Sequence, residues 1–237
     1  MAGSRRPVYR AAYPAIWSPS AGRAAGGLVV GPASVVSITD SSDTTGSNHT
    51  VALPGTSIGQ LLILLQASRA NVAIGWPAGY TEFVGEGAAS AVLDMAAAYR
   101  VADGLEGASI TTTTSLSRST ATQVYLINNH NAALVPPEGG QASSSGYNPP
   151  GLDPSWDAAE NPGAFGGTSG SNDLSGTFAV QSADLLSTLW IAWAGWDSAA
   201  GTGASSAPTN YGDYAEIDDG SGGHSAMCSA IRLLTSP

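Results

Sequence analysis

Four carboxylates lie close together near the C-terminus, where they could bind a cation. The cluster consists of Asp213, Glu216, Asp218 and Asp219. Calcium takes oxygen ligands of this kind, but the spacing is not that of an EF-hand, and such clusters more often form a solvated acidic loop. The cluster is therefore a weak calcium candidate, and we expect neither a metal nor a cofactor.

The other residue types used in catalysis show no catalytic spacing. His49, His130 and His224 do not form a zinc-binding pattern. The glycine-serine stretches at 167–170 and 220–224 do not read G-x-S-x-G, and no helix follows them. We assign no catalytic residue and expect a non-enzymatic protein.

Three tryptophans fall on or beside one predicted strand. With a period of two, Trp190 and Trp196 face one side of the sheet and Trp193 faces the other. Only one side can face the core, so the other needs a different cover. That cover is the long loop, the N-terminal arm, a neighbouring subunit or a glycan stacked on the ring.

Residues 1–47 have the composition of an extended anchoring arm. This arm combines arginines, which pair with carboxylates, and aromatic side chains, which fill pockets on a partner surface. The predicted partner-binding residues are Arg5, Arg6, Tyr9, Arg10, Tyr13, Trp17 and Arg23. A floppy terminus is the alternative interpretation. A long loop rich in glycine and proline spans residues 131–176 and adds Tyr147, Trp156 and Phe165 as candidate contact residues.

The composition excludes several classes of partner. The chain has 237 residues, a net charge of -10 and no lysine, so it has few cations with which to neutralise phosphates, and we expect no nucleic-acid binding. The longest apolar run, residues 61–65, is too short to span a membrane. The basic N-terminus lacks the apolar stretch of a signal peptide, which predicts a chain that is used without export.

The elements that must position these residues are predicted to be strands. Short apolar or alternating runs end at glycine and proline turn signals, and no capped amphipathic helix is present. The predicted strands lie near residues 50–53, 61–66, 95–101, 108–114, 122–127, 189–193 and 229–234. The fold class is therefore all-β.

Three short segments recur in the second part of the chain and predict two similar halves, at about 48–130 and 177–237. Residues 59–62 resemble 183–186, and residues 77–80 resemble 208–211, where each segment begins with a proline and ends with a tyrosine. Residues 95–101 resemble 227–233, with Met, Ala, Arg and an aliphatic residue at the same spacing. Two such units, each too small to close a core, are expected to pack as one β-sandwich.

The same segments carry a resemblance to a known family. The run Leu53-Pro54, Gln60-Leu61-Leu62, Gly75-Trp76-Pro77-Ala78-Gly79-Tyr80-Thr81 and Tyr99-Arg100-Val101-Ala102-Asp103-Gly104-Leu105-Glu106-Gly107 resembles jelly-roll-like modules in virion proteins of tailed bacteriophages and gene-transfer particles. Later segments with Pro149-Pro150, Pro154-Ser155-Trp156, Leu189-Trp190-Ile191-Ala192 and Pro208-Thr209-Asn210-Tyr211 are similar to the rest of that module. The resemblance covers roughly residues 48–237, with 157–181 as an insertion.

The resemblance implies a virion structural protein and no catalytic residue. We expect a capsid decoration (cement) or head-spike protein that docks on the shell through its arm and loops. Its partners would be the major capsid protein or other virion proteins and further copies of itself, and it would join the virion in the host cytoplasm. The alternative is a receptor-binding or glycan-binding module of a spike, tail fibre or baseplate that binds a host surface glycan.

Overall fold

The computed structural model describes residues 31–70, 72–84, 93–134, 138–143, 174–197, 207, 211–218 and 225–235. The strands are β1 (Ser34–Asp43), β2 (Asn48–Ala52), β3 (Leu61–Arg69), β4 (Ile74–Gly75), β5 (Thr81–Val84), β6 (Leu93–Val101), β7 (Ser109–Thr114), β8 (Thr120–Asn128), β9 (Glu138–Ser143), β10 (Leu174–Gln181), β11 (Ser187–Asp197), β12 (Gly212–Asp218) and β13 (Ser225–Thr235). In these ranges the only helical element is a 3-10 turn, η1 (Ala132–Leu134). No helix in the described part of the chain is long and apolar enough to cross a membrane. The predicted all-β class is confirmed.

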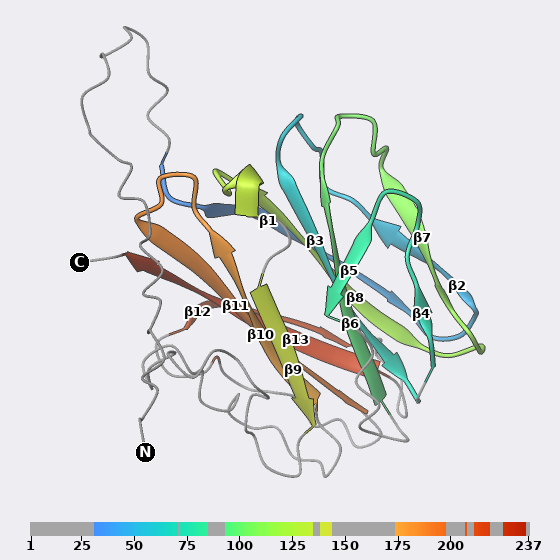
Figure 1. The fold of residues 1–237 in the computed structure, drawn as a ribbon. Helices are drawn as coiled ribbons and strands as arrows, with labels where there is room; N and C mark the ends of the chain where they lie inside the picture. The colour runs from blue at the N-terminus through green and yellow to red at the C-terminus, as the bar shows by residue number, and fades with distance from the viewer. Residues whose placement is uncertain are drawn as a thin grey trace, which may run out of the picture.

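The strands form three antiparallel sheets arranged as layers (Figure 1). The N-terminal sheet has the order β1-β8-β3-β6-β5, and the C-terminal sheet has the order β12-β13-β11-β10-β9. A small sheet, β2-β7-β4, forms the third layer. The two large sheets pack face to face, which confirms the predicted sandwich, and the jelly-roll-like connectivity that the resemblance implies stays a prediction.

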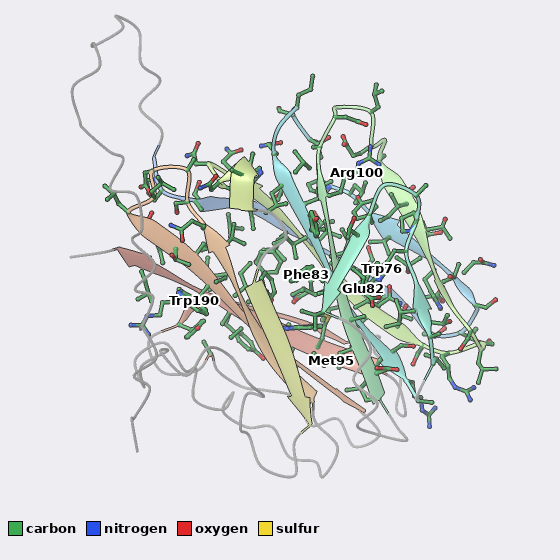
Figure 2. All side chains as sticks on the ribbon, viewed as in Figure 1. Trp76, Glu82, Phe83, Met95, Arg100 and Trp190 are labelled. Carbon is green, nitrogen blue, oxygen red and sulfur yellow. The ribbon has the colours of Figure 1, made fainter. Side chains whose placement is uncertain are left out.

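The main core lies between the two large sheets. Alternate residues of β3, β6 and β8 face alternate residues of β10, β11 and β13 across this interface. Phe83 on β5 makes an edge-to-face contact with Phe178 on β10, with ring centroids 5.3 Å apart, and Figure 2 shows Phe83 and Met95 between the sheets. Trp193 and Tyr125 are the largest fully buried side chains of this core.

The other face of the N-terminal sheet is buried beneath the small sheet. Leu62 and Leu64 on β3 pack with Val51 on β2 and Ile110 on β7. Because β3 is covered on both faces, residues 61–68 are all buried. The sequence prediction that residues 61–66 form a strand buried on both sides is therefore confirmed.

The two large sheets repeat the same order of strands. In each sheet an edge strand (β5 or β12) pairs with a strand that carries a methionine (β6 or β13). That strand pairs with the central strand (β3 or β11), and two further strands follow. Tyr80 directly precedes β5 and Tyr211 directly precedes β12, while Met95 on β6 and Met227 on β13 are both fully buried in the shared core. Two of the three predicted repeats, 77–80 with 208–211 and 95–101 with 227–233, therefore lie at equivalent positions in the two sheets.

The third predicted equivalence, between residues 59–62 and 183–186, is wrong. Leu185 and Leu186 are 65% and 66% exposed in the turn before β11, whereas Leu62 is fully buried inside β3. Strand pairing gives the true equivalence, because Met95 pairs with Ala67 and Met227 pairs with Gly195. Ala67 on β3 therefore corresponds to Gly195 on β11. Matching the two double leucines would instead place Ala67 four residues earlier on β11.

Two predicted boundaries also need correction. The arm was expected to reach residue 47, but Ser34–Asp43 forms β1 and pairs along its length with β8. The loop was expected to cover 131–176, but Glu138–Ser143 forms β9, which pairs with β10. Both are edge strands of polar or glycine-rich sequence, in which backbone hydrogen bonds to a strong neighbouring strand outweigh weak side-chain propensity.

Candidate functional site

An apolar groove opens where the edges of the two large sheets meet. Its volume is about 570 Å³, and it lies between β1 of the N-terminal sheet and β11, β12 and β13 of the C-terminal sheet. Val35 and Ile38 line one wall, while Leu189, Ile231 and Leu233 line the other. The groove size is in the range of sites that take small molecules or a few side chains.

Both edge strands that flank the groove are interrupted by a β-bulge. The register of β1 shifts between Val35 and Ser37, and that of β12 shifts between Gly212 and Ala215. Asp213, within the second bulge, has a φ of +47°, an uncommon conformation for a non-glycine residue. Bulges bend an edge strand and re-aim its side chains, and here one of them places Asp213 in the groove lining.

Two polar groups give the groove its chemical character. Asp213 contributes the only charged side chain among the residues that line it. The Oγ atom of Ser37 is buried and has no hydrogen-bond partner in the described part of the chain. An occupant with apolar side chains, a hydrogen-bonding backbone and positive charge nearby would suit these walls.

The structure places two members of the predicted calcium cluster, Asp213 and Glu216, in different surroundings. Asp213 lines the groove, whereas the Glu216 carboxylate accepts a hydrogen bond of 2.9 Å from the hydroxyl of Tyr214. Tyr214 packs on the outer face of the C-terminal sheet, while Ile217 beside Glu216 belongs to the main core. No group of three or more potential metal ligands occurs among the described residues. The side chains of Asp218 and Asp219 lie outside the described residues.

The tryptophans on β11 face opposite sides, as period two predicts. Trp193 is fully buried in the main core, and Trp190 is 5% exposed on the other side of the strand (Figure 2). Neither ring is available as a platform for a glycan. The Trp196 side chain lies outside the described residues.

The other predicted contact residues cannot be placed. The arm residues Arg5, Arg6, Tyr9, Arg10, Tyr13, Trp17 and Arg23 and the loop residues Tyr147, Trp156 and Phe165 lie outside the described residues, as does His224. What the structure does give is the point where the arm enters the sandwich. The Ala33 backbone N–H donates to Ser182 Oγ at 2.7 Å, and Asn129 Nδ2 donates to the Pro32 carbonyl oxygen. The arm therefore joins the body at one end of the groove.

Sequence reasoning missed a cluster that the resemblance motifs build, here called the Arg100 clamp (Arg100, Asp103, Glu106 and Thr56). Arg100 donates to Asp103 at 2.7 Å and lies 3.5 Å from a Glu106 carboxylate oxygen. Glu106 also accepts hydrogen bonds from the Thr56 hydroxyl and from the Asp103 and Gly104 N–H groups. The clamp fastens the loop between β6 and β7 to the loop before β3.

A glycine and a tyrosine of the same motifs complete this arrangement. The Arg100 guanidinium lies 5.9 Å from the centroid of the Tyr80 ring. Gly79 has a φ of +88°, a backbone conformation that favours glycine, and a Cβ atom there would lie 2.8 Å from Arg100 Nη1 and displace the guanidinium. Figure 2 shows Arg100 on the same side of the molecule as Trp76 and Glu82. These motifs thus have a structural explanation in loop fastening.

We expect Glu106→Gln to lower the free energy of unfolding by about 1.5 kcal/mol at neutral pH, since hydrogen bonds to a buried charge are lost. Burial alone would raise the pKa of Glu106, but hydrogen bonds from Thr56 and from backbone N–H groups and the charge of Arg100 lower it to about 2. The ordinary value is 4.5, so this stabilisation is complete above pH 4.5 and is lost as the pH falls towards 2.

Urea unfolding at pH 7 and pH 3 measures this effect, and the difference between variant and wild type should shrink at pH 3. Glu82→Gln is the matched control, because Glu82 is exposed and its single described bond, from Trp76 Nε1, survives in the amide. It should change stability by less than about 0.5 kcal/mol. If Glu106→Gln lowered the free energy of unfolding equally at both pH values, the ionic role of the clamp would be contradicted.

His49 forms buried polar contacts through both of its ring nitrogens. His49 lies between Asp43, at 3.3 Å from Nδ1, and Thr114, at 2.9 Å from Nε2. This order resembles a catalytic triad, but Thr114 is 5% exposed and donates its hydroxyl proton to the Leu116 carbonyl oxygen. The array fastens the β1–β2 turn to the β7–β8 turn. Burial lowers the pKa of His130, which favours its neutral form.

No family model, curated protein or solved structure matches the chain.

Proposed function

We propose that the chain is a non-enzymatic structural protein of a bacteriophage virion, a capsid decoration or head-spike protein that docks through its N-terminal segment. The observation that carries this proposal is the separation of charge along the chain. Residues 1–30 contain four of the eight arginines and none of the eighteen carboxylates. The remaining residues therefore form a strongly acidic body with a cationic segment attached at one edge.

Such a separation favours a protein that attaches by its end. The cationic segment pairs with carboxylates of a shell protein, and its aromatic residues supply anchors. The acidic body faces outward, where its charge opposes aggregation. Its connections, including the Arg100 clamp and the His49 contacts, fasten loops to each other within the described residues, as a load-carrying scaffold requires.

Deleting residues 1–25 is expected to abolish incorporation into particles while leaving the sandwich folded. Occupancy is measured by quantifying the protein in purified particles, and folding by circular dichroism and thermal unfolding of the isolated variant. The deletion ends before Gly31, so it leaves the contacts of Pro32 and Ala33 in place. Normal occupancy of the truncated protein would overturn the anchoring role.

A host-glycan-binding module is the second candidate, and one observation favours it. Trp76 is partly exposed, and its Nε1 donates to the exposed carboxylate of Glu82 at 2.7 Å. The partly exposed indole offers apolar surface and Glu82 offers hydrogen-bond acceptors, and the two together would suit a sugar ring that has both apolar and hydroxyl groups. A glycan array compares the wild type with Trp76→Ala, and binding that this substitution removes would favour the module.

A further inference from the structure

We infer that the groove between β1 and β13 takes the Leu28–Val30 stretch of a second copy of this chain, so that neighbouring copies are linked by exchanged N-terminal segments. This goes beyond docking on a shell, because it assigns the part of the arm nearest the sandwich to another copy. The distal aromatic and arginine residues remain available for the shell.

The walls of the groove match this stretch of sequence. Val35, Ile231 and Leu233 present apolar surface, and residues 28–30 are Leu-Val-Val. Leu233 is 43% exposed although it faces the apolar groove, so covering it would remove apolar surface from water. Ser37 Oγ has no hydrogen-bond partner among the described residues, and an incoming backbone would supply one.

The edge of the sheet provides a second means of recognition. β1 is the last strand of the N-terminal sheet, with β8 on one side and no paired strand on the other within the described residues. An extended segment can add to such an edge through backbone hydrogen bonds, while alternate side chains enter the groove. Val30 and its neighbours are β-branched or aliphatic, as an added strand prefers.

Charge favours the N-terminal segment over other apolar segments. The segment 1–30 carries four arginines and no carboxylate, and Asp213 is the charged group of the groove lining. The body around the groove is acidic overall, so a cationic segment gains electrostatic attraction before it docks.

The backbone at Gly31 indicates a second copy rather than the same chain. To lie beside its own β1, the segment would have to reverse over residues 31–33. Two-residue turns of types I′ and II′ need a positive φ at their first central residue, and three-residue hairpin loops need one at their last residue, but neither Gly31 nor Ala33 has a positive φ. Leu28 is five residues from Ala33, which is fixed to its own sandwich, so the stretch reaches about 17 Å at most and the exchange requires the two sandwiches to face each other with their grooves adjacent.

Disulfide trapping between full-length chains tests this inference. One chain carries Val29→Cys and the other, distinguished by its tag, carries Leu233→Cys, and the two are mixed with oxidised glutathione. We expect a mixed covalent dimer on a non-reducing gel. The native Cys228 is fully buried and gives little background. Ser34→Cys is a second acceptor at an exposed position of the opposite wall.

Leu116→Cys is the matched control, because Leu116 is a 52% exposed leucine in the β7–β8 turn, away from the groove lining. It should give no mixed dimer with Val29→Cys above the level of random collision. A cross-link that forms only within a chain carrying both Val29→Cys and Leu233→Cys would overturn the exchange, and so would the absence of any cross-link. These outcomes are read on purified protein, so they are distinguishable from failure of the particle-incorporation experiment.

Discussion

Trp193→Ala is expected to lower the free energy of unfolding by about 3–5 kcal/mol, the range found when a buried large aromatic side chain is removed. Trp193 lies at the centre of β11, is fully buried and packs between the two large sheets. Alanine would leave a cavity there that rigid neighbouring strands cannot close. Chemical unfolding monitored by circular dichroism measures the loss.

Trp193→Phe is the matched variant for this experiment. Phenylalanine keeps most of the apolar volume and removes the indole N–H, which has no partner in the described part of the chain. We therefore expect it to lose less than half as much stability as alanine. Trp76→Ala, at a partly exposed position outside the main core, should also cost clearly less. A Trp193→Ala variant within about 1 kcal/mol of wild type would contradict a core built between the sheets.

In the strongly apolar strands, the alternation of side chains along the strand predicted which side of the sheet each side chain faces. It placed Trp190 and Trp193 on opposite sides of β11 and predicted that residues 61–66 are buried on both faces. These strands are rich in apolar residues, so the local pattern records which face is covered. The same reasoning could not supply the cover itself, because the small sheet that covers β3 is assembled from three short strands, β2, β4 and β7, and an alternating pattern does not show which sheet a strand joins.

Edge strands and turns were harder to predict from the sequence. β1 and β9 have polar or glycine-rich sequences and owe their structure to pairing with β8 and β10. The pair Leu185 and Leu186 resembles the start of a buried strand, yet Leu185 has a φ of +60° in an exposed turn. Asp184 stabilises that turn by accepting hydrogen bonds from the Leu186 and Ser187 N–H groups, a contact that a hydrophobic pattern does not reveal.

The candidate site could be predicted only in fragments. Asp213 was singled out from the sequence, but with Glu216 as a fellow ligand, and the bulge in β12 sends the two side chains to different surroundings. The groove combines Val35 with Ile231, which are nearly two hundred positions apart in the chain. A local sequence pattern does not show that these two residues are neighbours, because they are brought together only when the two sheets pack.

Gly195→Val is expected to lower the free energy of unfolding by about 3 kcal/mol, at the upper end of the usual cost of overpacking. Gly195 and its equivalent on the other central strand, Ala67, meet where the two sheets approach each other. A Cβ atom at position 195 would lie 2.8 Å from Met95 Sδ and 3.2 Å from the Ala67 Cβ atom. The methionine side chain can move aside, but the Ala67 Cβ is fixed to its backbone, so the sheets must separate slightly.

A double-mutant cycle separates this clash from the lower conformational freedom of valine. Met95→Ala leaves a cavity in the wild-type background, but in the Gly195→Val background the same truncation makes room, so it should cost about 1–2 kcal/mol less there. Gly212→Val is the matched control, because a Cβ atom on that β12 glycine meets nothing within 4 Å, and its stability should stay within about 0.5 kcal/mol of wild type. Additive effects of Met95→Ala and Gly195→Val would mean that the methionine does not contact position 195 and would contradict the clash as the cause of the loss.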